Sequence, residues 1–502
     1  MRAGILVRLS LAGGRTDTLR TLLTGASAAL ATATLLAAAT VASIRGGEWV
    51  IDGDGNSTMA PGVEQYTSPL LQEAGLRPGV VLALLLLTLP VLALAGQCGR
   101  LGAPARDRRL AAIRLAGATP GQAVLIAVAE TVVSSLLGSL AGLGVYLGIR
   151  RLLHDPGPDG TLPLPTDVLP SPVLMAMTVA VVPVLAGAIG VLLMRGVVMT
   201  PFGVVRHERK RGPRPWPGAA VLVGIGLVNL ALWIEDRFDV PDTAVGVSLL
   251  SGVVLVMAGV VLGTGWISHT AGRLLHRFGR GPTTLLAGRR MTADPWNGSR
   301  TMSALLGAAV IGGIAAGYHA YFQTQARAEN RLNTMMGYPQ PPAEMSEFYV
   351  GAVRLVLLAV GVGVAVSAAG MLVALAESIM ARRRTFAALT AAGTPGRTLA
   401  GSLLWQTVTP LIPAFVLAVG SGLLLTRSVY SEVSVGGGAV ETCAGPGDCV
   451  RTVDPVVIIG VPVPWEQLAL LSGGGLLAVL LVAGVGALVL RGSVAAEEIR
   501  VA

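Results

Sequence analysis

Ten stretches of the chain are each apolar over roughly 20 residues, the length that a helix needs to cross the hydrocarbon core of a bilayer. Over all 502 residues, 53% are hydrophobic and only 13% are charged. A soluble protein of this length could not bury so much apolar surface, so the sequence predicts an all-α polytopic membrane protein. The predicted spans are residues 21–44, 79–98, 120–149, 172–194, 217–234, 244–267, 301–322, 352–378, 398–426 and 467–490.

The distribution of charge predicts how the chain is threaded. With a cytoplasmic N-terminus, most of the 37 Lys and Arg residues fall on inward segments and most of the 28 acidic residues on outward ones. Basic residues are usually in excess on cytoplasmic loops, so we expect a plasma-membrane protein with both termini in the cytoplasm. This topology explains the net charge of +9 without nucleic-acid binding. The first apolar run exceeds the core of a cleavable signal peptide and predicts a retained anchor.

The connecting segments are short. The inward ones are the N-terminal arm, 99–119, 195–216, 268–300, 379–397 and the tail; the outward ones are 45–78, 150–171, 235–243, 323–351 and 427–466. No outward loop is long enough for a large extracellular domain. Small residues four apart on one helix allow close packing, either at specific contacts or generally. Such pairs are Gly138 with Gly142, Gly144 with Gly148, Gly259 with Gly263, and Gly313 with Gly317.

Two inward segments nearly repeat each other. One reads RRLAAIRLAGATPG from Arg108 and the other RRTFAALTAAGTPG from Arg383. Both lie between long apolar helices with the same in/out sense, which indicates a parallel duplication. We therefore expect a cytoplasmic arm (1–20), a four-helix module (21–206), a linker with two helices (207–300) and a second four-helix module (301–502). Matching Gly117 to Gly393 and matching the two Thr-Pro-Gly triplets give alignments that differ by one residue.

Each copy is predicted to form an amphipathic helix. The apolar face is formed by Leu110, Ile113 and Gly117 in the first copy and by Phe386, Leu389 and Gly393 in the second. The basic residues are Arg108, Arg109 and Arg114 in the first copy and Arg383 and Arg384 in the second. Such a helix lies on a membrane surface or inserts its apolar face into a partner groove. Alternatively, the arginines only satisfy topology and bind anionic lipid.

At these residues the chain resembles the FtsX-like permease family, which includes MacB-type and BceB-type transporter subunits. The resemblance is carried by 108–119 with Glu130, Gly138 and Gly142, and by Glu377, 382–384, 388–389 and 393–395. Weaker similarity follows the fourth helix of each half, at 200–206 and 495–500. The near absence of lysine is typical of GC-rich bacterial genomes such as those of actinobacteria.

The resemblance implies a permease that docks a cytoplasmic ABC ATPase through the repeated segments. With one segment in each half, two ATPase subunits would bind one permease chain, and ATP and Mg would be held by the ATPase. Ten helices resemble the BceB arrangement, but that type and the MacB type carry a large extracellular domain that this chain lacks. Capture of a peptide by such a domain is therefore not expected.

The sequence offers no catalytic constellation, so we expect no enzyme activity and no cofactor in this chain. A Walker A loop needs Gly-Lys-Ser/Thr, whereas the only lysine, Lys210, lies between Arg209 and Arg211. The histidines lack metal-ligand spacing, and we expect no metal site. They are His154, His207, His269, His276 and His319.

Three polar residues fall at unusual places in the predicted helices. Glu130 lies about ten residues into the third span, where an ionisable group is usually functional or internally paired. Gln406 occupies the matching place in the second half if the two glycines are aligned. We interpret Glu130 as a structural partner within the bundle, with transport chemistry as the alternative. Glu377 lies near the inner end of the eighth helix and is expected to form an ion pair with the following arginines.

The cysteines predict one disulfide. Cys443 and Cys449 flank a Gly-Pro-Gly turn in the last outward loop, which faces an oxidising compartment. Cys98 lies at the inner end of the second span and is expected to be a free thiol.

Three functions fit these features. The first is an ABC permease subunit that exports or extracts an amphiphile: a lipid, a lipopeptide or an antimicrobial peptide. The second is a signalling subunit that passes the state of the ATPase to an extracellular cell-wall enzyme or sensor. The third is an ion-driven secondary transporter, which the scarcity of intramembrane charge argues against.

Overall fold

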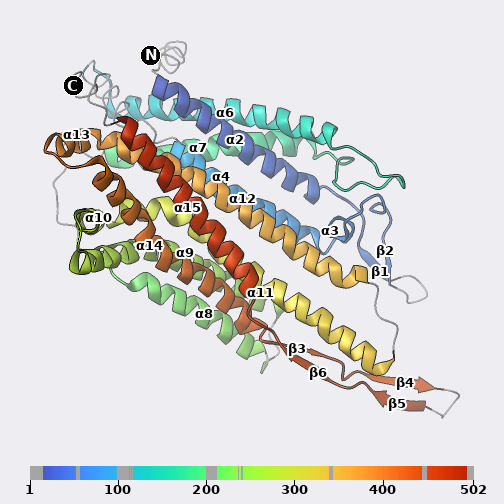
Figure 1. Cartoon of the computed structure of the whole chain (residues 1–502). Coiled ribbons are helices and arrows are strands. Elements are labelled where there is room, and N and C mark those ends of the chain that lie inside the picture. The colour runs from blue at the N-terminus through green and yellow to red at the C-terminus, as the bar shows by residue number, and fades with distance from the viewer. Residues whose placement is uncertain are drawn as a thin grey trace. The chain divides into compact units, whose positions relative to one another are not determined.

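The structure is a computed structural model that describes residues 15–51, 57–98, 112, 115, 117–198, 212–235, 237–238, 241–337, 343–443 and 449–493. Most of these residues are helical (Figure 1). The long helices are α2 (Arg15–Ala42), α4 (Arg77–Cys98), α6 (Pro120–Leu152), α7 (Pro172–Val198), α8 (Trp216–Glu235), α9 (Asp242–Phe278), α11 (Pro295–Met336), α12 (Ala343–Ala381), α14 (Gly396–Val429) and α15 (Trp465–Ser493). The short ones are α3 (Pro69–Gln72), α10 (Pro282–Ala293) and α13 (Arg383–Ala391).

Each predicted span coincides with one long helix. Nine of the helices in the described part of the chain have the length and composition of a membrane span. The remaining predicted span, 79–98, coincides with α4. The prediction of an all-α polytopic membrane protein is therefore confirmed.

Two helices run well beyond their predicted spans. Helix α9 continues to Phe278 and is followed by α10, so most of the predicted inward loop 268–300 is helical. Helix α11 continues to Met336, where Gly337 ends it in the left-handed region with φ of 68°. Hydropathy marks where apolar residues stop, whereas a helix continues until a residue such as glycine breaks it.

The last loop that is predicted to face outward forms a two-part antiparallel ribbon (Figure 1). Strand β3 (Glu432–Val435) pairs with β6 (Val457–Gly460), and β4 (Ala439–Cys443) pairs with β5 (Cys449–Val453). The β3–β6 part packs against the end of α11, where Val433 and Val457 share a buried cluster with Ala328. The sequence analysis predicted only a loop here.

Contacts divide the chain into two compact units. The first comprises Met1–Arg211, Ala365–Leu404 and Leu480–Ala502, and the second comprises Gly212–Val364 and Trp405–Val479. The boundaries fall inside α12, α14 and α15, so these helices contribute to both units.

In the first unit, α2 packs against α4, α6 and α7. Its contact with α6 is close because both helices carry small residues. A Cβ added at Gly138 would lie 2.2 Å from the Gly25 oxygen, and one at Gly142 would lie 2.4 Å from the Ala29 oxygen. The residue numbers rise together along both helices, so α2 and α6 run parallel.

Two loops of the first unit that are predicted to face outward pack together. Strands β1 (Trp49–Ile51) and β2 (Ser57–Met59) form a small hairpin in the first loop. Beyond it, Tyr66 is buried with Leu162 of the second loop, and its hydroxyl donates to Asp167 at 2.8 Å. Burial and the neighbouring carboxylate raise the pKa of Tyr66 above its ordinary value.

In the second unit, glycines again mark the close helix contacts. A Cβ at Gly313 would lie 2.4 Å from the Val419 oxygen of α14, and one at Gly259 would lie 2.8 Å from the Pro217 oxygen of α8. Gly144 and Gly148, by contrast, face open space. Specific packing therefore explains three of the glycine pairs that the sequence singled out, but not the pair Gly144 and Gly148.

Candidate functional site

The second repeated segment forms α13 and ends in a glycine turn. The Gly393 N–H donates to the Thr390 carbonyl at 2.9 Å, and the Thr394 N–H donates to the Leu389 carbonyl at 3.0 Å. Gly393 itself has φ of 85°. These two bonds and the left-handed glycine make a Schellman motif, which closes α13 and turns the chain into α14.

The first copy has a corresponding turn. Gly117 has φ of 97°, and Thr119 then caps α6 by accepting from the Gln122 N–H while the Gln122 side chain accepts from the Thr119 N–H. The remaining residues of this predicted docking segment lie outside the described part of the chain. They are Arg108, Arg109, Leu110, Ile113 and Arg114.

The turns settle which alignment of the two copies is correct. In each copy, the left-handed glycine lies three residues before the first helical residue, with Gly117 preceding Pro120 and Gly393 preceding Gly396. The alignment through the two glycines therefore holds, and the alignment through Thr-Pro-Gly is off by one residue. With the glycines aligned, Gln406 is the counterpart of Glu130.

Helix α13 buries one face and exposes the other. Phe386 is only 1% exposed, and Leu389 is half-buried, whereas Thr385, Ala388 and Gly393 are exposed. Phe386 therefore lies inside the protein instead of on its surface. The side chains of Arg383 and Arg384 lie outside the described residues.

One residue of the first segment was not singled out by the sequence analysis. Leu115 is 91% exposed. Its neighbours in the repeat are alanines and arginines, so periodicity alone gave no reason to choose it. It is a candidate contact for a partner.

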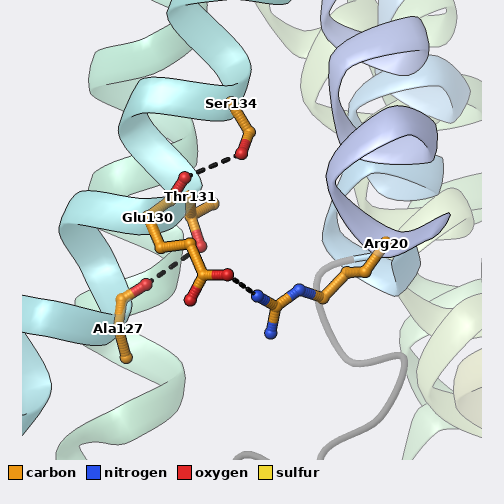
Figure 2. A network of polar contacts seen from close by, with 5 residues as sticks. All are labelled: Arg20, Ala127, Glu130, Thr131 and Ser134. Carbon is orange, nitrogen blue, oxygen red and sulfur yellow. Dashed lines mark hydrogen bonds and ion pairs between the residues drawn. The ribbon is translucent and has the colours of Figure 1, made fainter. Parts of the chain in front are cut away.

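An ion pair links α2 and α6 (Figure 2). The Arg20 guanidinium donates through Nη2 to Oε1 of Glu130, and the two side chains are 6% and 10% exposed. The Ser134 hydroxyl donates to the Glu130 carbonyl at 2.8 Å in the next turn. The sequence analysis expected an internal partner for Glu130 but placed Arg20 in the N-terminal arm. Helix α2 begins earlier, at Arg15, and this brings Arg20 into the bundle.

The other two predicted polar residues are half-buried. Gln406 lies on α14 and carries no charge that could repeat the ion pair of the first half. Glu377 lies on α12, just before Arg382. Its ion pair with the following arginines stays a prediction.

The described residues contain no group of three metal-ligating side chains. His319 is 4% exposed, and its Nδ1 is 3.1 Å from Nε2 of Gln467. Cys98 is a buried free thiol, as expected.

The backbone register supports the predicted disulfide. Strands β4 and β5 place Cys443 directly opposite Cys449. Opposed residues of an antiparallel pair have Cα atoms roughly 4.5–5.5 Å apart, within the range of disulfides. The two side chains lie outside the described residues, so the bond itself stays a prediction.

Together, these features define a class: a multi-pass membrane protein in which a helical unit with a glycine-terminated connecting segment occurs twice. Comparison with protein-family models matches the FtsX-like permease C-terminal family at residues 79–198 and again at 357–494. The matches cover just over half of the chain, which belongs to the FtsX-like permease family. No curated protein matches the chain.

The two matches confirm the family, and one match falls in each predicted half of the chain. Each includes the second, third and fourth predicted helix of a half and the repeated segment between the second and third. Members of this family are permease-type membrane subunits of ABC transporters, generally not catalytic themselves, and they generally work with a cytoplasmic ATPase. Assignment to the MacB or BceB type stays a prediction.

Proposed function

We propose that this chain is the membrane subunit through which a separate cytoplasmic ATPase drives export or extraction of an amphiphile. The observation that carries the proposal is the repeated connecting segment with its left-handed glycine, once inside each family match. Two such segments would dock two ATPase subunits, with both termini of the chain on the cytoplasmic side. ATP and Mg would be bound by the ATPase.

The geometry of α13 supports a docking role. Phe386 anchors the helix from within, and the Schellman turn at Gly393 fixes where α14 begins. Because α13 is short and held at both ends, it transmits a displacement of a bound partner to the following membrane helix, α14. The exposed residues Thr385 and Ala388 lie on the free face and are available for contact.

The first docking segment would present Leu115 together with its arginines. A 91% exposed leucine in a basic segment fits a partner groove that has an apolar floor and an acidic rim. The two docking sites would then differ, because the glycine alignment places Ala391 opposite Leu115. We infer that the two ATPase contacts are unequal in strength.

Co-purification tests the docking role. The tagged chain is co-expressed with the ABC ATPase encoded by a neighbouring gene, and the ATPase recovered is measured for Arg109→Glu, Arg384→Glu and the double variant. We expect the double variant to lose at least about tenfold of the bound ATPase, because each reversal places like charges together. The matched control is Arg327→Glu with Arg331→Glu, two exposed arginines on α11. Unchanged recovery for the double variant would reject docking through these segments.

The ribbon favours a second candidate, a transmembrane signalling subunit. Its β3–β6 part is held against α11, so movement of α11 reaches the predicted outward side directly. Replacing residues 439–453 by a short Gly-Ser turn separates the two functions. Loss of an extracellular partner with unchanged transport would support signalling, whereas loss of transport alone would support export.

A further inference from the structure

Helix α8 covers one face of α9 and stops partway along it. A Cβ at Gly252 of α9 would lie 2.9 Å from the Gly224 oxygen, and one at Gly259 would lie 2.8 Å from the Pro217 oxygen. Helix α8 begins at Trp216, so it cannot extend much beyond the level of Gly259. Past that level, Gly212 approaches His269 and α10 packs on the neighbouring turns of α9 around Gly272, but Trp266, Arg273 and Arg277 stay exposed.

Three tryptophans mark the level where α8 begins. Trp216 is 59% exposed, Trp266 of α9 is 39% exposed and Trp296 of α11 is 36% exposed. The ring of Trp296 packs against Gly265, where an added Cβ would lie 3.0 Å from it, so α9 and α11 are in register here. Tryptophan concentrates where the hydrocarbon core meets the headgroups, so this level is the edge of the membrane.

Exposed arginines lie just beyond the tryptophans. Trp266, Arg273 and Arg277 are spaced by seven and four residues, so they share the face of α9 that α8 leaves free. At 1.5 Å per residue, Arg273 lies about 10 Å past Trp266, and its long side chain can reach back to the headgroups. Arg214, two residues before Trp216, is also exposed.

The charge of this region has a single sign. No aspartate or glutamate occurs from residue 243 to residue 293, which includes the end of α9 and all of α10. A basic surface at the membrane edge matches the phosphates of anionic lipids, which are concentrated at that level. The family matches do not include this region, and the ATPase-docking segments lie elsewhere in the sequence.

We propose that the free face of α9 below Trp266, with Arg273, Arg277 and Arg214, binds the headgroups of anionic phospholipids of the inner leaflet. The tryptophans fix the depth at which the lipid headgroup lies at the edge of the membrane, and the arginines pair with the lipid phosphates. Binding stabilises the two linker helices against each other, because the lipid contacts both Arg273 and Arg277 of α9 and Arg214 just before α8. The proposal does not depend on the ATPase.

The test compares the purified full chain in nanodiscs of phosphatidylcholine alone and of phosphatidylcholine with phosphatidylglycerol. We expect phosphatidylglycerol to raise the thermal unfolding midpoint and to remain bound in native mass spectrometry. Arg273→Gln with Arg277→Gln should weaken the apparent affinity for phosphatidylglycerol roughly 10-fold or more. Arg273→Lys with Arg277→Lys should retain most of it, which separates charge from folding. The matched control is Arg327→Gln with Arg331→Gln on the outward part of α11.

Four results would overturn the proposal. An undiminished response of the glutamine variant to phosphatidylglycerol would show that these arginines do not bind the lipid. An equal loss in the control variant would show only a general effect of charge. A full midpoint shift caused by inorganic phosphate in phosphatidylcholine nanodiscs would identify a site for free anions. If the glutamine variant loses a soluble protein partner but keeps its lipid response, the surface is a protein interface instead.

Discussion

The Arg20 guanidinium on α2 donates to the Glu130 carboxylate on α6, and both side chains are almost fully buried. Because α2 and α6 run parallel, the pair fixes their register near the ends predicted to be cytoplasmic. The glycine contacts continue the same register along both helices. The second half offers Gln406 at the position of Glu130, so the two halves are not equivalent at this point.

Removing one member of this pair should destabilise the protein. Arg20→Gln or Glu130→Gln leaves a buried charge without its partner, which costs about 3–5 kcal/mol. The double variant Arg20→Gln with Glu130→Gln should recover part of this loss, because neither charge remains. Thermal unfolding of the purified chain in detergent measures the coupling between the two changes. Additive losses in the double variant would show that the pair does not act as a unit.

A methyl group at Gly138 should disrupt the α2–α6 contact. Gly138→Ala places a Cβ 2.2 Å from the Gly25 oxygen, so the helices must move apart at a cost of about 1–3 kcal/mol. Gly144→Ala on the same helix is the control, because it faces open space. We expect the unfolding midpoint to fall only for Gly138→Ala. Equal midpoints for the two variants would contradict the close contact.

The glycine turn of α13 should be required for ATPase docking but not for membrane insertion. Gly393→Ala forces an L-residue into the left-handed region, at a cost of about 1–2 kcal/mol. The C-terminal end of α13 then changes, and the exposed face of the helix takes another orientation. The amount of ATPase that co-purifies should therefore fall severalfold, while expression of the chain stays unchanged. Gly396→Ala, inside the first turn of α14 with open space around it, is the control. Normal co-purification with Gly393→Ala would separate the turn from docking.

The cysteines of the ribbon should be oxidised in cells. A membrane-impermeant maleimide should label neither Cys443 nor Cys449 on intact cells and should label both after reduction. Cys98 is buried and serves as the unlabelled internal reference. Labelling of both ribbon cysteines without reduction would disprove the disulfide, and no labelling after reduction would place the ribbon on the cytoplasmic side.

Hydropathy was sufficient to locate the membrane helices, because the bilayer imposes a minimum apolar length on each span. It could not locate the ends of α9 and α11, whose last turns are polar and amphipathic. The ribbon had a visible signal: short β-branched runs of sequence, separated by glycines, flank Cys443 and Cys449.

The site was only partly accessible from the sequence. The repeat predicted a short amphipathic helix, and the structure shows one at α13. It wrongly placed Gly393 on that helix, whereas Gly393 lies in the left-handed turn that follows Ala391. The partner of Glu130 was not predictable, because Arg20 is far away in the chain and belongs to a helix that begins before its apolar run. Likewise, the burial of Phe386 was not predictable from the sequence, because it depends on packing between different segments and a local sequence pattern does not describe such packing.

The length of α11 has a mechanical consequence. Its 42 residues form a rod about 63 Å long, roughly twice the thickness of the hydrocarbon core. Its first turn packs against α9 at Gly265, and its last turns hold the ribbon. A rotation of the rod by about 5° around one end displaces the other end by about 5 Å. For a rigid helix of this length, a small tilt at one end therefore becomes a displacement of atomic dimensions at the other.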